Sequence, residues 1–225
     1  MNQQLINYFN QFVSEHKKEL FGRLIKHRTR YLTLVLEDIY QPHNASAVLR
    51  TCDCFGIQDV HIIENDNLYE INPDVALGSS NWLTMNRYNE TNNNTLAAIN
   101  LLKKQGYRIV ATTPHTNDVN LEDFDLTKGK AALFFGTEMR GVTNLVLENA
   151  DEFLKIPMYG FTESFNISVS ASIILHHLTY KLRNSALNWQ LDEVEKQEVM
   201  LNWLKVAIRD SEAIEREFYK RKLNV

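Results

Sequence analysis

Polar residues and glycines that could bind a ligand are concentrated in a few short parts of the sequence. Each part directly follows an apolar run of strand-forming residues, and together they are residues 38–53, 113–118, 136–141 and 159–166. In an open parallel α/β sheet, ligands bind at the carboxyl ends of the strands. Gly136, Gly141 and Gly160 lie in the last two parts, and glycine lets a backbone approach a ligand closely. The sequence therefore predicts a binding site built from strand-end loops.

The chemistry of several common sites is excluded by missing motifs. The chain has neither a G-x-G-x-x-G dinucleotide fingerprint nor the G-K-[ST] of a phosphate-binding P-loop, so a Rossmann-type methyltransferase or dehydrogenase is disfavoured. The G-x-S-x-G turn of an α/β-hydrolase is also missing. Cys52 and Cys54 have no second pair to complete a zinc site, so we expect no metal and a reducing compartment.

Length and charge fit an ordinary globular protein. The 225 residues suit one domain with helical extensions, and 23% of them are charged. The net charge of −4 counts mildly against a nucleic-acid binder, although phosphate contact needs only a local basic cluster. We expect a cytoplasmic protein without a membrane partner, because no apolar run approaches ~18 residues and no basic leader precedes one.

The elements that must position these loops are read from apolar periodicity. Apolar strand-forming runs predict strands at 32–37, 59–64, 107–112, 131–135 and 152–158. Helical spacing predicts helices at about 44–55, 95–104 and 166–183. Asn44 is the expected N-cap of the first of these helices and Gly56 its C-terminal stop. The alternation indicates an α/β fold with a mostly parallel sheet covered by helices on both faces.

Helices are also expected at both ends of the chain. Residues 3–30 read as one helix with a basic second half, and residues 190–222 as one or two helices. We therefore predict a helical extension at 1–30, the α/β domain at 31–186 and a second helical extension at 187–225. The helix at 166–183 is apolar nearly all round, which indicates burial against the core, a second subunit, or both.

Three stretches of the chain resemble the motifs of a known family. They are NASAVLRTCDCFG at 44–56, LFFGTEMRGVTNLVLENAD at 133–151 and IPMYGFTESFNISVSASIIL at 156–175. They are similar, in order and spacing, to those of the SPOUT-class RNA 2′-O-ribose methyltransferases of the TrmH family. The resemblance implies a SPOUT fold with a C-terminal trefoil knot that binds S-adenosyl-L-methionine. It also implies a homodimer whose interface includes the helix at 166–183.

The resemblance assigns roles residue by residue. It implies catalytic roles for Asn44, Arg50, Glu138, Ser164 and Asn166. It implies that the cofactor is bound around Thr112, Gly136, Gly141, Ile156, Met158 and Phe165, with Thr113 as the alternative to Thr112. The third motif reads Ser-Phe-Asn where the family usually has Ser-Leu-Asn, and the preceding Thr162-Glu163 leaves the charge of the pocket open.

Methyl transfer from a sulfonium to a hydroxyl is an in-line displacement, and the site must also accept the hydroxyl proton. Proposals for the family make the arginine, here Arg50, the base. Deprotonating an arginine of pKa ~12.5 at pH 7 costs roughly 7 kcal/mol. We therefore expect the Arg50 fork to hold the phosphate beside the target ribose, with at most a shared role in proton transfer.

The expected substrate is tRNA, at guanosine-18 of the D-loop, because helices flank both ends and no separate N-terminal RNA-binding domain precedes the first strand. Lys26, Arg28 and Arg30 are the candidate RNA contacts. An rRNA 2′-O-ribose methyltransferase of the same family is the first alternative. A non-catalytic RNA-binding protein with the same fold is the second.

Overall fold

The computed structural model describes residues 2–91, 93–114, 119–137 and 140–223. They form two compact units, which we describe separately. One unit comprises the two chain ends, Met1–Arg28 and Gln190–Val225, and the other comprises Thr29–Trp189.

The larger unit is built on a parallel sheet. Its strands are β1 (Leu32–Glu37), β2 (Asp59–Ile63), β3 (Thr84–Tyr88), β4 (Arg108–Thr112), β5 (Val119–Asn120), β6 (Ala131–Phe135) and β7 (Glu152–Lys155). The described strands pair in the order β3-β2-β1-β6-β4-β7-β5, and every pairing is parallel. The predicted parallel sheet is confirmed. Strand β4 pairs with β6 on one side and with β7, which follows β6 in the chain, on the other.

Helices cover both faces of this sheet, as predicted. They are α3 (Pro42–Phe55), α4 (Pro73–Ala76), α5 (Asn94–Lys104), α6 (Asn144–Asn149) and α7 (Ile167–Arg183). Leu34 and Leu36 of β1 belong to the apolar core shared with α3 and α7, while Val35 belongs to the core shared with α5 and α6. This alternation follows from the two-residue period of a strand.

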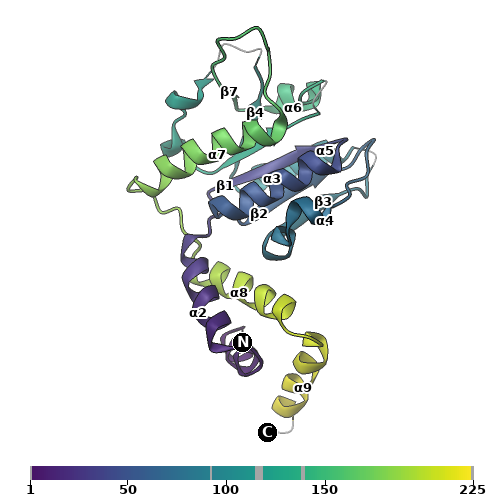
Figure 1. Cartoon of the computed structure of the whole chain (residues 1–225), viewed down its shortest axis with the longest axis vertical. Coiled ribbons are helices and arrows are strands. Elements are labelled where there is room, and N and C mark those ends of the chain that lie inside the picture. The colour runs from purple at the N-terminus through teal and green to yellow at the C-terminus, as the bar shows by residue number, and fades with distance from the viewer. Residues whose placement is uncertain (1, 92, 115–118, 138–139, 224–225) are drawn as a thin grey trace. The chain divides into compact units, whose positions relative to one another are not determined.

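Helices α3 and α7 lie side by side and run in the same direction (Figure 1). The hydroxyls of Thr51 and Ser172 are 3.3 Å apart, and the Arg183 guanidinium donates to the carbonyl oxygen of Phe55 at 2.7 Å. Gly56 ends α3 with a φ of +76°, which confirms its predicted role.

The predicted N-cap of α3 is wrong. The cap is Gln41, and Asn44 lies inside the first turn because Pro42 begins the helix. The strand predicted at 152–158 is also too long. It ends at Lys155, two residues before Pro157, which has no N–H to donate to a neighbouring strand.

The smaller unit is helical. The single helix predicted at 3–30 is wrong, because the chain forms α1 (Asn2–Phe9) and α2 (Glu15–Leu24), each followed by a short 3₁₀ turn. The break falls at Ser14, whose hydroxyl accepts from the backbone N–H of Lys17 at 3.4 Å and so caps α2. At the other end of the chain, where one or two helices were predicted, there are two, α8 (Glu193–Ala207) and α9 (Ser211–Leu223).

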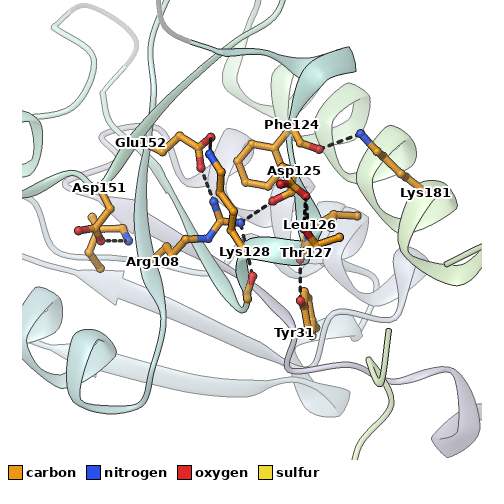
Figure 2. Close-up of polar contacts among 12 residues, drawn as sticks. Tyr31, Arg108, Phe124, Asp125, Leu126, Thr127, Lys128, Asp151, Glu152 and Lys181 are labelled. Carbon is orange, nitrogen blue, oxygen red and sulfur yellow. Dashed lines mark hydrogen bonds and ion pairs between the residues drawn. The ribbon is translucent and has the colours of Figure 1, made fainter. Parts of the chain in front are cut away.

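The amino end of the central strands is closed by polar contacts (Figure 2). Arg108 at the start of β4 pairs with Glu152 at the start of β7, and Lys128 reaches the same carboxylate at 3.1 Å. Arg108 also donates to the carbonyl oxygen of Asp125 at 2.9 Å. Lys181 of α7 donates to the carbonyl oxygen of Phe124 at 2.8 Å. These bonds tie two strands, a helix and the loop before β6 together.

Candidate active site

A cavity of about 430 Å³ opens at the carboxyl ends of β4, β6 and β7. The structure brings all the predicted cofactor-binding residues into its lining: Thr112, Gly136, Gly141, Ile156, Met158 and Phe165. Ser164 lines it as well. The strand-end loops that the sequence singled out therefore meet in space, as a parallel sheet requires.

Two backbone hydrogen bonds join Thr137 and Gly141 in the loop after β6. The backbone N–H of Thr137 donates to the carbonyl oxygen of Gly141 at 3.0 Å, and the N–H of Gly141 donates back to Thr137 at 2.8 Å. A Cβ at position 136 would lie 2.0 Å from the carbonyl oxygen of Gly141, so only glycine fits there. Gly141 has a φ of +68°. The predicted catalytic residue Glu138 lies outside the described residues.

A buried carboxylate that sequence reasoning missed anchors the far side of this loop. Glu37, 1% exposed at the end of β1, accepts from the backbone N–H of Thr143 at 2.9 Å and from its hydroxyl at 2.8 Å. Thr143 is the N-cap of α6 and follows Val142, which lines the cavity. The Thr95 hydroxyl donates to the same carboxylate at 2.7 Å. A carboxylate ending an otherwise apolar strand was the available signal.

Asn44 and Asn166 bind each other across the start of α3 and α7. The Asn166 amide donates to the Asn44 side-chain oxygen at 3.0 Å, and the Asn44 amide donates to the side-chain oxygen of Gln41 at 2.9 Å. Asn166 also caps α7, because its side-chain oxygen accepts from the backbone N–H of Ser168 at 2.9 Å. Neither asparagine lines the cavity, but Asn166 directly follows Phe165, which does.

Arg50 lies on the exposed side of α3 and is not part of the described lining. The structure of a single chain therefore does not bring the guanidinium into the cavity with the predicted cofactor-binding residues. The position of Arg50 along the helix relative to Asn44 is fixed by the rise of 1.5 Å per residue, but the direction of its side chain is not.

Two charged side chains in the lining were not predicted as site residues. They are Arg140, from the loop after β6, and Glu163, from the loop before α7. Thr113 lines the cavity beside Thr112, whose hydroxyl donates to the carbonyl oxygen of Phe134 at 2.7 Å. These residues lie in or beside the strand-end segments, but a sequence does not reveal which way a loop side chain points.

The three predicted RNA contacts differ in their surroundings. Lys26 is exposed. Arg28 is only 4% exposed, and its guanidinium lies 5.1 Å from the ring centre of Trp203. Arg30 pairs with Asp59 at 3.0 Å. Arg28 is thus packed and Arg30 ion-paired, while Lys26 is exposed, and RNA contact at these three residues stays a prediction.

Several ionisable groups with shifted pKa values lie on the flank of the sheet at β2 and β3. Hydrogen bonds from the Arg87 guanidinium hold the pKa of Glu64 below its usual value, against the opposing effect of burial. Burial lowers the pKa of His61 to about 4, and its Nδ1 lies 2.8 Å from the hydroxyl of Tyr88. The described part of the chain holds no cluster of three or more His, Cys, Asp or Glu side chains suited to a metal ion.

Comparison with known proteins shows to which family the chain belongs. Residues 31–176 match the SpoU rRNA Methylase family. The chain belongs to the SpoU methylase family. This SpoU family member is 43% identical over 210 residues to the tRNA (guanosine(18)-2'-O)-methyltransferase of Borreliella burgdorferi, with 93% of this chain and 94% of the relative covered. The predicted family membership is confirmed.

Two further relatives of this SpoU family member agree. It is 30% identical over 194 residues to the tRNA (guanosine(18)-2'-O)-methyltransferase of Thermus thermophilus, covering 85% of this chain and 97% of the relative. The crystal structure of the A. aeolicus TrmH/SpoU tRNA modifying enzyme matches with a TM-score of 0.77 and 26% identity. That match covers 87% of this chain and 98% of the other.

Proposed function

We propose that this SpoU family member transfers a methyl group from S-adenosyl-L-methionine to a ribose 2′-hydroxyl of tRNA, at guanosine-18 of the D-loop. The observation that carries the proposal is the cavity at the ends of β4, β6 and β7, which contains every residue predicted to bind the cofactor. The names of its tRNA-modifying relatives support the choice of tRNA.

The cavity fits the cofactor. Its volume of about 430 Å³ lies within the usual range for small-molecule sites. The missing side chain at Gly136 leaves backbone next to the bound group, and Ile156, Met158 and Phe165 supply an apolar wall. When bound, S-adenosyl-L-methionine supplies the sulfonium-activated methyl group. Arg140 and Glu163 give the cavity one charge of each sign, which suits a ligand that carries both a carboxylate and cationic groups.

The proposed catalytic residues act by placement. Ser164 faces the ligand from the lining of the cavity, and Asn44 fixes Asn166, at the end of the loop between β7 and α7, to α3 through the 3.0 Å amide bond. Arg50 grips the RNA phosphate beside the target ribose with its planar fork. The catalytic role proposed for Glu138, which lies outside the described residues, rests only on the resemblance of its motif to the family motif.

We also propose a homodimer in which α7 lies at the interface. Val169 and Tyr180 on α7 are 43% and 68% exposed, and Tyr159 and Phe161 in the preceding loop are almost fully exposed. Such a group of exposed apolar side chains is typical of a surface that a partner covers. A second subunit would also explain why one chain leaves Arg50 outside the cavity.

The remaining assignments follow the same proposal. The methyltransferase domain spans 31–186 and includes the trefoil knot, and the helical extensions at 1–30 and 187–225 flank it, with Lys26 contacting RNA. None of the described helices is both long and apolar enough to span a membrane. We propose the cytoplasm as its location, where tRNA is modified.

The decisive experiment is to incubate the full chain with labelled S-adenosyl-L-methionine and total RNA, and then map the methylated ribose. Label at guanosine-18 of tRNA is expected. Label in rRNA instead would favour the first alternative, which the name of the family makes relevant. Calorimetry with the cofactor tests the second alternative, because a non-catalytic RNA-binding protein is expected to bind none.

Replacing Arg50 with lysine tests the phosphate clamp. The variant keeps the charge but loses the two-pronged geometry, so we expect kcat/KM for tRNA to fall roughly tenfold to a hundredfold. Arg50 is exposed, so folding and cofactor affinity stay unchanged. Near-full turnover by Arg50→Lys would contradict the clamp.

A further inference from the structure

A second hollow lies at the same edge of the sheet as the cofactor cavity, at the carboxyl ends of β1 and β2. It is an open groove of about 640 Å³ between the loop that follows β1 and the loop that follows β2. The first loop contributes Tyr40, Gln41 and His43, and the second contributes Asp66, Leu68 and Glu70. We call it the β1–β2 groove.

The walls of the β1–β2 groove are fixed to each other. One carboxylate oxygen of Asp38 accepts from the backbone N–H groups of Asn65 and Asp66, at 2.7 and 2.9 Å. Asp38 does this from a φ of +52°, a conformation that costs a non-glycine residue free energy and is concentrated at functional sites. The groove is therefore shaped before any ligand arrives.

The groove is linked to the cofactor cavity by the pair of amide hydrogen bonds described above. Gln41, in the groove wall, accepts from Asn44 at 2.9 Å, and Asn44 accepts from Asn166 at 3.0 Å. Asn166 adjoins Phe165 in the wall of the cofactor cavity. Since β1 also pairs with β6, whose carboxyl end opens on the cavity, the groove and the cavity lie over neighbouring strands of the sheet.

The chemistry of the β1–β2 groove selects the kind of occupant. Tyr40 and Leu68 are 73% and 79% exposed, and an exposed aromatic ring is a surface on which RNA bases stack. Asp66 and Glu70 repel a phosphate, so the occupant presents hydrogen-bond donors instead. Guanine carries two adjacent donors, N1–H and the 2-amino group, and carboxylates accept from both.

We propose that the β1–β2 groove binds the base of the nucleotide that is methylated. Tyr40 stacks on the base, and the carboxylates of Asp66 and Glu70 select guanine by accepting from N1–H and the 2-amino group. The inference rests on the proposed ribose methylation and adds the determinant of base identity to it.

Inosine tests the inference, because it differs from guanosine only by the missing 2-amino group. Two tRNA transcripts are prepared that are identical except for guanosine or inosine at the methylated ribose, and kcat/KM is measured with the full chain on each. The wild-type protein is expected to prefer guanosine by roughly tenfold. The double variant Asp66→Asn/Glu70→Gln is expected to lose that preference. Glu90→Gln, an exposed carboxylate outside the groove lining, is the matched control and keeps it.

Tyr40→Ala separates stacking from base selection. It is expected to lower kcat/KM on both transcripts alike by about tenfold, while calorimetry shows unchanged cofactor affinity. A wild-type guanosine-to-inosine ratio in the double variant would overturn the inference. So would a change in sedimentation of Tyr40→Ala, since the groove would then be a contact between subunits. If the wild-type protein methylates neither transcript nor any other RNA, the proposed function itself fails.

Discussion

The amino and carboxyl ends of strands β4 and β7 differ in the residues that they carry and in what those residues do. At the amino end, Arg108 and Glu152 form an ion pair between β4 and β7, and both side chains are largely buried. At the carboxyl end of the same strands, the chain places glycine and loop backbone around a cavity of about 430 Å³. A buried ion pair joins the strands at one end, and a glycine-containing loop leaves room for a ligand at the other.

The difference indicates where stability and function are separated in this fold. A buried ion pair contributes little net free energy, but removing one partner leaves a buried charge unpaired. A cavity stabilises nothing by itself, but it cannot bind its ligand if an added side chain displaces the loop that lines it. Variants at the amino end are therefore expected to affect unfolding, and variants at the carboxyl end to affect cofactor binding.

The largest effect is expected from Arg108→Met at the amino end. The buried carboxylate of Glu152 keeps only the half-exposed Lys128 as a partner, so the free energy of unfolding should fall by about 3 kcal/mol, the lower end of the range for a broken buried pair. Urea denaturation measures this change, and cofactor affinity of the folded protein should stay unchanged. The double variant Arg108→Met/Glu152→Met should recover at least half of the loss. If cofactor affinity fell together with stability in Arg108→Met, the two ends of the strands would not be separate in function.

The next effect is expected from Gly136→Ala at the carboxyl end. The added Cβ would lie 2.0 Å from the carbonyl oxygen of Gly141, so the loop must move. We expect cofactor affinity to fall by roughly a hundredfold, or about 2.7 kcal/mol, measured by calorimetry.

Gly22→Ala is the matched control, because a Cβ there meets nothing within 4 Å and position 22 lies inside helix α2. It should stabilise the protein by up to about 1 kcal/mol and leave cofactor affinity unchanged. A cofactor affinity of Gly136→Ala within threefold of the wild-type value would show that the loop can move to accommodate the added Cβ at little cost.

Protonation of His61 at low pH is expected to lower the free energy of unfolding by about 2 kcal/mol. Its folded pKa of about 4 lies below the ordinary value of 6.5, so the unfolded chain binds more protons between these values. Stability from this group is therefore full above pH 6.5 and is lost as the pH falls toward 4. Unfolding free energies at pH 7.5 and pH 5 should differ by about 2 kcal/mol more in wild type than in His61→Gln. Equal pH dependence would place the titration elsewhere.

The smallest effect is expected from Glu37→Gln, which sharpens the comparison at the carboxyl end. The amide replaces one oxygen that accepts from Thr143, so the loop beside Val142 is held less firmly. We expect the KM for the cofactor to rise about tenfold with kcat nearly unchanged. Glu64→Gln, another buried carboxylate on the same edge, should lower stability without this rise in KM. A fall in kcat instead would show that Glu37 does more than position the loop.

Much of the fold followed from local pattern. The strands at 32–37 and 131–135 are buried throughout because helices cover both faces of the sheet, and their mostly apolar residues can be recognised in a sequence. The polar strand β3 and the two-residue strand β5 were missed, because an edge strand needs no apolar pattern and a very short one has no period.

The sequence by itself determined the family, the strand-end loops and six of the residues that line the cavity, because motif order and strand polarity are local properties. Only the tertiary structure decided that Asn44 bridges to Asn166 rather than capping its own helix, that Arg28 lies over Trp203, and that Arg140 and Glu163 line the cavity. The direction and burial of a side chain depend on neighbours distant in sequence, and only packing of the complete chain places those neighbours.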